Sequence, residues 1–175
     1  MNKYSVIRYL SFLVMFFSAS QSFAIMLGLS TEELVKGSEI VVMGDVENAE
    51  SQWSADGKTI FTRASVAITE VVRGITLQTR IAVEYEGGEV GNIGFRVSDV
   101  AVLEPGENVI LFLKSGKGKK DGIVYHMVGK AQGKYAVGED RIARKKGFSL
   151  TAGQEGIIDN DIPVRALIEK IRRVK

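Results

Sequence analysis

The segment from Phe61 to Leu113 constrains the fold more than any other part of the chain. It contains two long runs of strand-forming residues, and a glycine-rich turn between Gly87 and Gly94 separates them from a third, wholly apolar run that follows Pro105. Short strands divided by glycine and proline are typical of all-β sandwiches and barrels, whereas a parallel sheet needs helical crossovers. We therefore predict that this segment forms the wall of a small antiparallel β-barrel.

The strand pattern continues on both sides of this segment. The predicted strands are 39–46, 58–72, 77–85, 94–98, 109–113, 123–128, 133–137 and 141–144. Gly44 predicts a bulge or bend in the first strand. In the strand 77–85 apolar and polar residues alternate, which predicts one solvent-exposed face that carries Glu84 and Glu86. The run 109–113 is apolar throughout, so we expect it to be a central strand.

Two helices are expected outside the strands. Ser30 and Glu33 have the spacing of a capping box and predict a short helix over 31–36. Near the end of the chain, about 162–174, four apolar residues fall on one helical face: Val164, Leu167, Ile168 and Ile171. We expect this amphipathic helix to pack on the barrel; a helix that binds a partner is the alternative.

The first 24 residues predict a signal peptide. Basic residues at Lys3 and Arg8 precede a short apolar run, and Ser22 and Ala24 are small residues suited to cleavage after Ala24. The chain has no cysteine, which excludes a lipoprotein anchor, disulfides and thiolate metal sites. We expect one domain over 25–175, periplasmic or secreted, without stable membrane insertion after cleavage. An uncleaved membrane anchor is the alternative.

Charge excludes one class of function and suggests another. Removing Lys3 and Arg8 from the 23 basic residues leaves 21, equal to the 21 acidic residues, so a general nucleic-acid binder is not expected. The distribution is uneven, because residues 25–113 contain 6 basic and 14 acidic residues whereas 114–146 contain 10 basic and 3 acidic. We therefore expect one end of the fold to be positively charged.

The residues that could carry out catalysis are few. The single histidine, His126, lies in a predicted strand, and no Gly-x-Ser-x-Gly motif accompanies it. One histidine without cysteine is a poor basis for a zinc site. Glu84 and Glu86 fit a solvated strand face as well as a carboxylate pair. The sequence predicts no catalytic residue, no metal and no cofactor.

Binding residues are easier to nominate. The segment 114–122 is basic and rich in glycine, which predicts the exposed tip of a hairpin. Trp53 lies in a polar stretch, 48–57, that we expect to be a loop, where it either packs on the barrel rim or forms an exposed contact. The candidate binding residues are Trp53, Lys117, Lys119, Lys120, Lys130 and Lys134.

Three segments carry a resemblance to a known family. The segments 38–46, 71–74 and 129–134 resemble the netrin-module layout of the tissue inhibitors of metalloproteinases. The resemblance implies an OB-like barrel with flanking helices. The chain also resembles small exported bacterial proteins of unassigned function, which share the turn Gly-Gly-Glu-Val-Gly and the sequence Pro-Gly-Glu before an apolar strand.

The resemblance does not extend to the inhibitory mechanism. Those inhibitors place the α-amino group of an amino-terminal cysteine on the protease zinc, whereas the predicted mature start here is Ile25 and no cysteine exists. Metal ligation by the amine of Ile25 therefore stays a separate hypothesis. The fold expected is mainly β: a closed or partly open OB-like antiparallel β-barrel with a short N-terminal helix and a C-terminal amphipathic helix.

These observations favour an exported, non-enzymatic binding module. Its expected partner is another exported protein, with a protease as one candidate. The alternative is binding of polysaccharide or another anionic polymer through the basic glycine-rich loop. A hydrolase that works through carboxylates is the least favoured function.

Overall fold

The computed structural model describes residues 28–119, 123–146 and 158–175. The helices are α2 (Thr31–Gly37), the 3-10 helix η1 (Lys130–Gly133) and α3 (Val164–Arg173). The strands are β1 (Ile40–Trp53), β2 (Ile60–Arg73), β3 (Arg80–Glu86), β4 (Gly88–Val90), β5 (Ile93–Phe95), β6 (Asn108–Lys117), β7 (Ile123–Met127), β8 (Lys134–Val137), β9 (Ile142–Arg144) and β10 (Ile162–Pro163). The predicted signal peptide, Ile25 and Lys120 lie outside the described residues.

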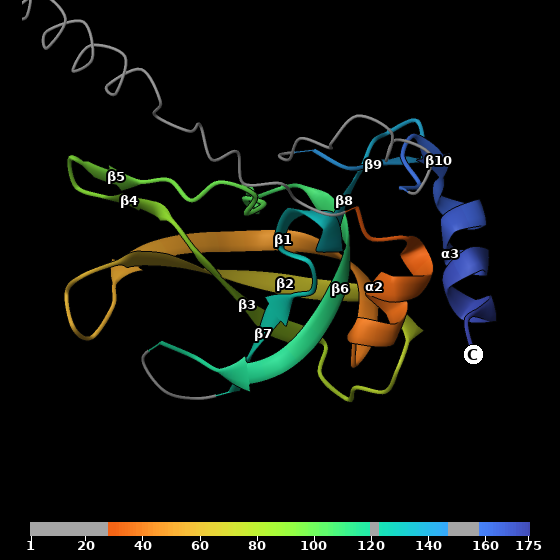
Figure 1. Cartoon of the computed structure of the whole chain (residues 1–175), viewed down its shortest axis with the longest axis horizontal. Coiled ribbons are helices and arrows are strands. Elements are labelled where there is room, and N and C mark those ends of the chain that lie inside the picture. Colours follow the sequence, from red (N-terminus) through yellow and green to blue (C-terminus); the bar gives the residue numbers. More distant parts are fainter. Residues whose placement is uncertain (1–27, 120–122, 147–157) are drawn as a thin grey trace, which may run out of the picture.

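Five of these strands form a ring-like sheet (Figure 1). β1 pairs with β2 and β2 with β3, both antiparallel, and β3 meets β7 in parallel at one residue pair, Val83 and Tyr125. β7 pairs with β6, and β6 returns to β1, again antiparallel. β8, β9 and β10 continue outward from β6. The prediction of a mainly β fold is confirmed.

β1 changes its neighbours halfway along its length. Residues 40–45 pair with β6 on one edge while β2 occupies the other edge. The β1–β2 register shifts beside Gly44 and again between Val46 and Asn48. A Cβ at Gly44 would lie 2.3 Å from the backbone oxygen of Ala67, so only glycine fits here. The predicted irregularity at Gly44 is confirmed.

Two apolar clusters pack on opposite faces of the sheet. β6 contributes to both, because Val109, Leu111 and Leu113 belong to the cluster inside the ring, whereas Ile110 and Phe112 belong to the cluster beneath the helices. All five side chains are fully buried. Burying an aliphatic or aromatic side chain of this size stabilises a protein by about 1.5–3 kcal/mol. This two-sided burial explains why the run is apolar throughout, as expected for a central strand.

Both helices form where they are expected. The Ser30 side chain accepts a hydrogen bond from the backbone N–H of Glu33 at 3.2 Å, and the Glu33 carboxylate accepts one from the Ser30 N–H at 2.8 Å. The capping box is therefore complete. α3 buries the apolar face anticipated from its spacing, with Leu167 and Ile171 inaccessible to solvent. It packs on the outer apolar cluster beside α2.

Three strand predictions need correction. The polar stretch 48–57 is not a loop throughout, because β1 continues to Trp53 and pairs with residues 60–65 of β2. The strand expected over 77–85 begins only at Arg80, and Leu77 is 98% exposed in the preceding loop. The strand expected over 94–98 is instead β5, which ends at Phe95 and forms a small separate hairpin with β4.

A buried lysine follows β9. Lys145 is only 6% exposed, and its amino group has no hydrogen-bond partner among the described residues. The amino group lies 4.6 Å from the centre of the Tyr135 ring. Burial lowers the pKa of Lys145 to about 7, although the negative charge of Asp159 opposes this shift. Protonated Lys145 is therefore a poorly compensated charge inside the fold.

This burial makes stability depend on pH. An unfolded lysine keeps its ordinary pKa near 10.5. Between pH 7 and that value the unfolded state binds more protons, so stability rises with pH across this window. We expect Lys145→Met to raise the free energy of unfolding by about 2–4 kcal/mol at about pH 7, and by under about 1 kcal/mol at about pH 10. Urea denaturation at the two pH values measures both differences.

The neighbouring Lys146 provides the control, because it is exposed. Lys146→Met should change stability little at either pH. An equal effect of Lys145→Met at both pH values would contradict the assigned cause.

Candidate functional site

Three of the predicted binding lysines surround one pocket. Lys117 ends β6, Lys119 follows in the β6–β7 hairpin, and Lys130 begins η1. Together with residues of β2, β3 and β7 they line an open pocket of about 420 Å³, which we call the lysine pocket. Lys120 falls outside the described residues. The topology thus brings to one place lysines from two segments that are separated by β7.

The pocket opens where β3 and β7 part. Beyond the single pair of Val83 and Tyr125, the two strands form no further ladder pairs. His126 bridges the gap, with its Nδ1 3.0 Å from the backbone oxygen of Glu84. A carbonyl oxygen only accepts hydrogen bonds, so Nδ1 is the donor in this contact. His126 therefore links β7 to β3 across the gap between the two strands.

Glu84 is buried, contrary to the prediction of an exposed strand face. It is 2% exposed, and its carboxylate accepts a hydrogen bond from Arg63 Nη2 at 3.0 Å. The other carboxylate oxygen accepts one from the backbone N–H of Lys119 at 2.8 Å. The prediction failed because β7 and the hairpin after β6 cover this side of β3. Glu84 thereby fixes the start of the basic hairpin tip to β3.

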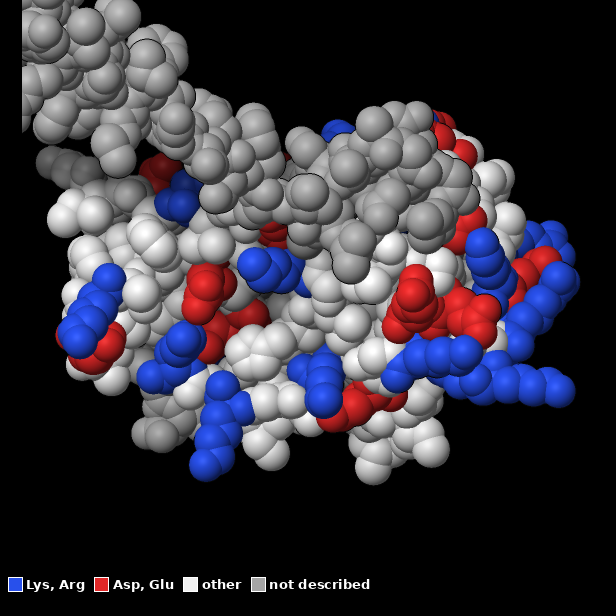
Figure 2. Space-filling model, in the orientation of Figure 1, with Lys and Arg blue, Asp and Glu red and all other residues white. Residues whose placement is uncertain are grey.

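The positive charges around the pocket are only partly neutralised. The Lys119 amino group lies 3.7 Å from a carboxylate oxygen of Glu86. Within the described chain, no ion pair forms with Lys117 or Lys130, and both side chains are exposed. Figure 2 shows this face with basic side chains standing beside acidic ones rather than as one continuous basic surface. The pocket retains a net positive charge at its rim.

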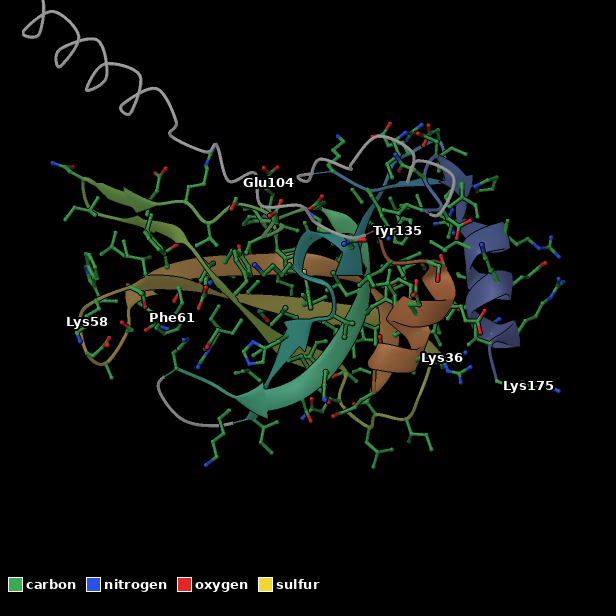
Figure 3. The ribbon with its side chains drawn as sticks, in the orientation of Figure 1. Lys36, Lys58, Phe61, Glu104, Tyr135 and Lys175 are labelled. Atoms are coloured by element: carbon green, nitrogen blue, oxygen red, sulfur yellow. The ribbon has the colours of Figure 1, made fainter. Side chains whose placement is uncertain are left out.

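The β1–β2 turn also approaches the basic hairpin tip. The pKa of Asp56 is held below its ordinary value, chiefly by a hydrogen bond from Ser54 and by one from the Lys58 backbone, with a smaller contribution from the charge of Lys119. Lys58 lies at the tip of this turn, close to Phe61 in the view of Figure 3. Lys119 is thus close enough to the β1–β2 turn for its charge to act on Asp56.

Apolar residues form the rest of the pocket wall. Phe61 and Tyr85 come from adjacent strands and are largely buried, while Val100 and Met127 are partly exposed. Burial raises the pKa of the Tyr85 hydroxyl, which hydrogen-bonds with the backbone of Leu103. Tyr85 therefore stays neutral at physiological pH. The pocket combines an apolar wall with a cationic rim, as is common in small binding sites.

The two remaining candidates lie elsewhere. Trp53 stands at the far end of β1, 37% exposed, and does not line the lysine pocket. Lys134 forms an ion pair with Glu107 at 2.6 Å and donates to the backbone oxygen of Val102 at the same distance. Its charge is thus used within the fold. Of the described candidates, only Lys117, Lys119 and Lys130 share a site.

The chemistry of the pocket favours binding of anions. Both carboxylate oxygens of Glu84 already accept hydrogen bonds within the fold, from the Arg63 guanidinium and the Lys119 amide. Among residues 28–119, 123–146 and 158–175, no group of three or more His, Cys, Asp or Glu side chains could hold a metal ion.

In the same residues, no helix is long and apolar enough to cross a membrane.

Sequence reasoning missed how these residues assemble. The sequence predicts Glu84 and Glu86 together on an exposed strand face and His126 in a separate strand, yet all three line the lysine pocket. The parallel contact between β3 and β7 joins them, and it spans more than 40 positions along the chain, as in the pair Val83 and Tyr125. Local patterns of polarity carry no signal for such a contact.

Glu84 can be tested by an isosteric change. Glu84→Gln removes the negative charge between Arg63 and the Lys119 amide, so we expect a loss of about 1–3 kcal/mol in the free energy of unfolding. Hydrogen exchange at the Lys119 amide should become faster. Urea denaturation and exchange measured by NMR check the two effects. The control Glu86→Gln affects an exposed pair and should cost less than about 0.5 kcal/mol; equal losses would contradict the anchoring role.

Comparisons of the chain with protein-family models, with curated proteins and with solved structures gave no match.

Proposed function

We propose that this chain is an exported, non-enzymatic binding module with an OB-like architecture, and that the lysine pocket binds an anionic ligand. The observation that carries the proposal is the convergence of Lys117, Lys119 and Lys130 on one pocket. Their cationic groups suit carboxylate, sulfate or phosphate groups of a polysaccharide or other anionic polymer. The apolar wall suits the less polar faces of such a ligand.

The order of strands supports the OB-like assignment. Around the ring the order is β1, β2, β3, β7, β6, with β6 returning to β1. In OB folds, ligands bind to the face of the second and third strands and to the loops after the first and fourth strands. The lysine pocket lies between β2, β3 and the hairpin after β6, which is the fourth strand of this ring. A fold alone does not establish function, so the charged rim carries more weight.

A matched pair of variants tests the proposal. The double variant Lys117→Ala/Lys130→Ala removes the two rim charges that have no ion pair within the described chain. With a sulfated oligosaccharide or polyglutamate as probe, we expect affinity to fall about tenfold. The slope of log affinity against log salt concentration should become less steep by about two, because two fewer counterions are released on binding. Isothermal titration calorimetry at several salt concentrations measures both quantities on the mature chain.

The control variant removes the same charge elsewhere. Lys36 and Lys175 lie on the side of α2 and α3, at the opposite end from Lys58 (Figure 3). Lys36→Ala/Lys175→Ala should leave binding close to that of the parent chain. An equal loss in both double variants would mean that general charge attraction, not the pocket, causes binding. Absence of binding to either probe in the parent chain would overturn the anion proposal.

Recognition of another exported protein is the second candidate function. It is favoured by large apolar side chains that are exposed on the described surface, among them Phe95 at 40% and Val102 at 59%. Neither residue lines the lysine pocket. A protein partner would therefore bind a different surface from an anionic ligand, and its binding would resist salt.

A further inference from the structure

The outer half of β1, residues 48–53, has one open edge, on the side away from β2. Ser54 N–H donates to the backbone oxygen of Thr59 at 2.8 Å, which fixes the alternation of hydrogen bonds in the β1–β2 hairpin. By this alternation, the backbone groups of Ala49, Ser51 and Trp53 point away from β2. Within the described chain they have no hydrogen-bond partner. Three consecutive outward positions thus present free N–H and C=O groups.

Among the described residues, this edge of β1, on the side away from β2, is occupied as far as Val46. The Val46 N–H donates to the backbone oxygen of Glu107 at 2.9 Å, and its oxygen accepts from the Gly106 N–H at 2.7 Å. At this point the chain before β6 turns away through Pro105. The free edge therefore begins where β6 stops being a neighbour. A strand added there would continue the line of β6, antiparallel to β1.

A groove accompanies the free edge. Ala49 and Ser51 of β1 line it together with Phe95 of β5 and Val102 of the following segment. Its volume is about 990 Å³, larger than that of the lysine pocket. The β4–β5 hairpin forms one wall and extends beside the outer half of β1 (Figure 1). A Cβ at Gly88 would lie 2.2 Å from the Ser51 hydroxyl, so this hairpin packs tightly against the strand.

Exposed apolar side chains gather around the same edge. Trp53 ends the strand at 37% exposure, and Ile93 at 54% lies in the β4–β5 hairpin. Phe95 and Val102 in the groove wall are exposed by 40% and 59%. These are half of the large apolar residues left exposed in the described chain. Apolar surface rimmed by polar groups is typical of interaction sites.

We propose that the open edge of β1 binds an extended segment of a partner protein by β-strand addition. An extended peptide backbone supplies a matching row of alternating donors and acceptors at the same strand spacing. Alternate side chains of the added strand would face the groove, where Phe95 and Val102 favour apolar residues. The groove is lined by cations and anions, such as Arg96 and Glu104, so charge of one sign does not select the ligand. This site is separate from the lysine pocket.

The first experiment examines the edge in the free, full mature chain. Hydrogen exchange measured by NMR should be fast at the amides of Ala49, Ser51 and Trp53. It should be slow at Glu50 and Gln52, whose N–H groups face β2. Slow exchange at all five amides would mean that the edge is already covered, and would overturn the proposal.

The second experiment supplies the probe. Random peptides of about ten residues are displayed on phage and selected on the mature chain in about 0.5 M salt, which suppresses binding through exposed charges. We expect the selected peptides to slow exchange at Ala49, Ser51 and Trp53 about tenfold or more. Methylation of alternate peptide nitrogens should abolish binding, because it removes backbone donors. A selection without binders, or binders that leave these amides unchanged, would overturn the proposal.

Matched variants separate this site from other apolar surface. Phe95→Ala/Val102→Ala should weaken binding of the selected peptides about tenfold. Leu77→Ala/Ile123→Ala removes apolar side chains that are 98% and 81% exposed at other places, and should leave binding unchanged. Lys117→Ala/Lys130→Ala should also have no effect. Failure here and failure of anion binding are therefore distinguishable.

Discussion

The pairing of β1 on both edges is the constraint on which the rest of the structure depends. Over residues 40–45 the strand joins β2 to β6 and closes the ring-like sheet. Gly44 permits this, since its missing side chain lets the β2 backbone approach closely. Beyond Val46, β2 is the one strand of the described chain that pairs with β1, and the β4–β5 hairpin packs against the same part of the strand. The closed half surrounds the inner apolar cluster, and in the open half the outward backbone groups have no hydrogen-bond partner within the described chain.

The short contact between β3 and β7 is the second place where the ring departs from regular pairing, and the lysine pocket lies beside it. β3 and β7 share one pair, and the side chains of Glu84 and His126 complete the connection that a longer ladder would have made with backbone hydrogen bonds. The buried carboxylate holds a loop, while exposed lysines stand at the rim. Each departure from regular pairing thus coincides with one of the two binding surfaces that we propose, one for anionic groups and one for a peptide backbone.

Local patterns predicted the elements better than their assembly. The capping box at Ser30, the apolar face of α3 and the two-sided burial of β6 depend on neighbours in sequence, so they could be recognised. Two predictions based on the polarity of the local sequence were wrong: the loop that contains Trp53 and the exposed position of Glu84. The polar outer half of β1 is still a strand because β2 pairs with it, and Glu84 is buried because β7 lies parallel to β3. Of the predicted lysines that the structure describes, Lys117, Lys119 and Lys130 converge, whereas Lys134 pairs with Glu107 within the fold.

Ring closure also determines how the chain must fold. Ile40 and Leu113 pair although they lie 73 positions apart in the sequence, so a large loop must close before that contact forms. Proteins dominated by such distant contacts fold on the scale of milliseconds to seconds. Until residues 108–113 arrive, both halves of β1 lack their second neighbour. A partly folded chain in which β1 has paired with β2 alone would therefore expose a long strand edge, the kind of surface through which folding chains aggregate.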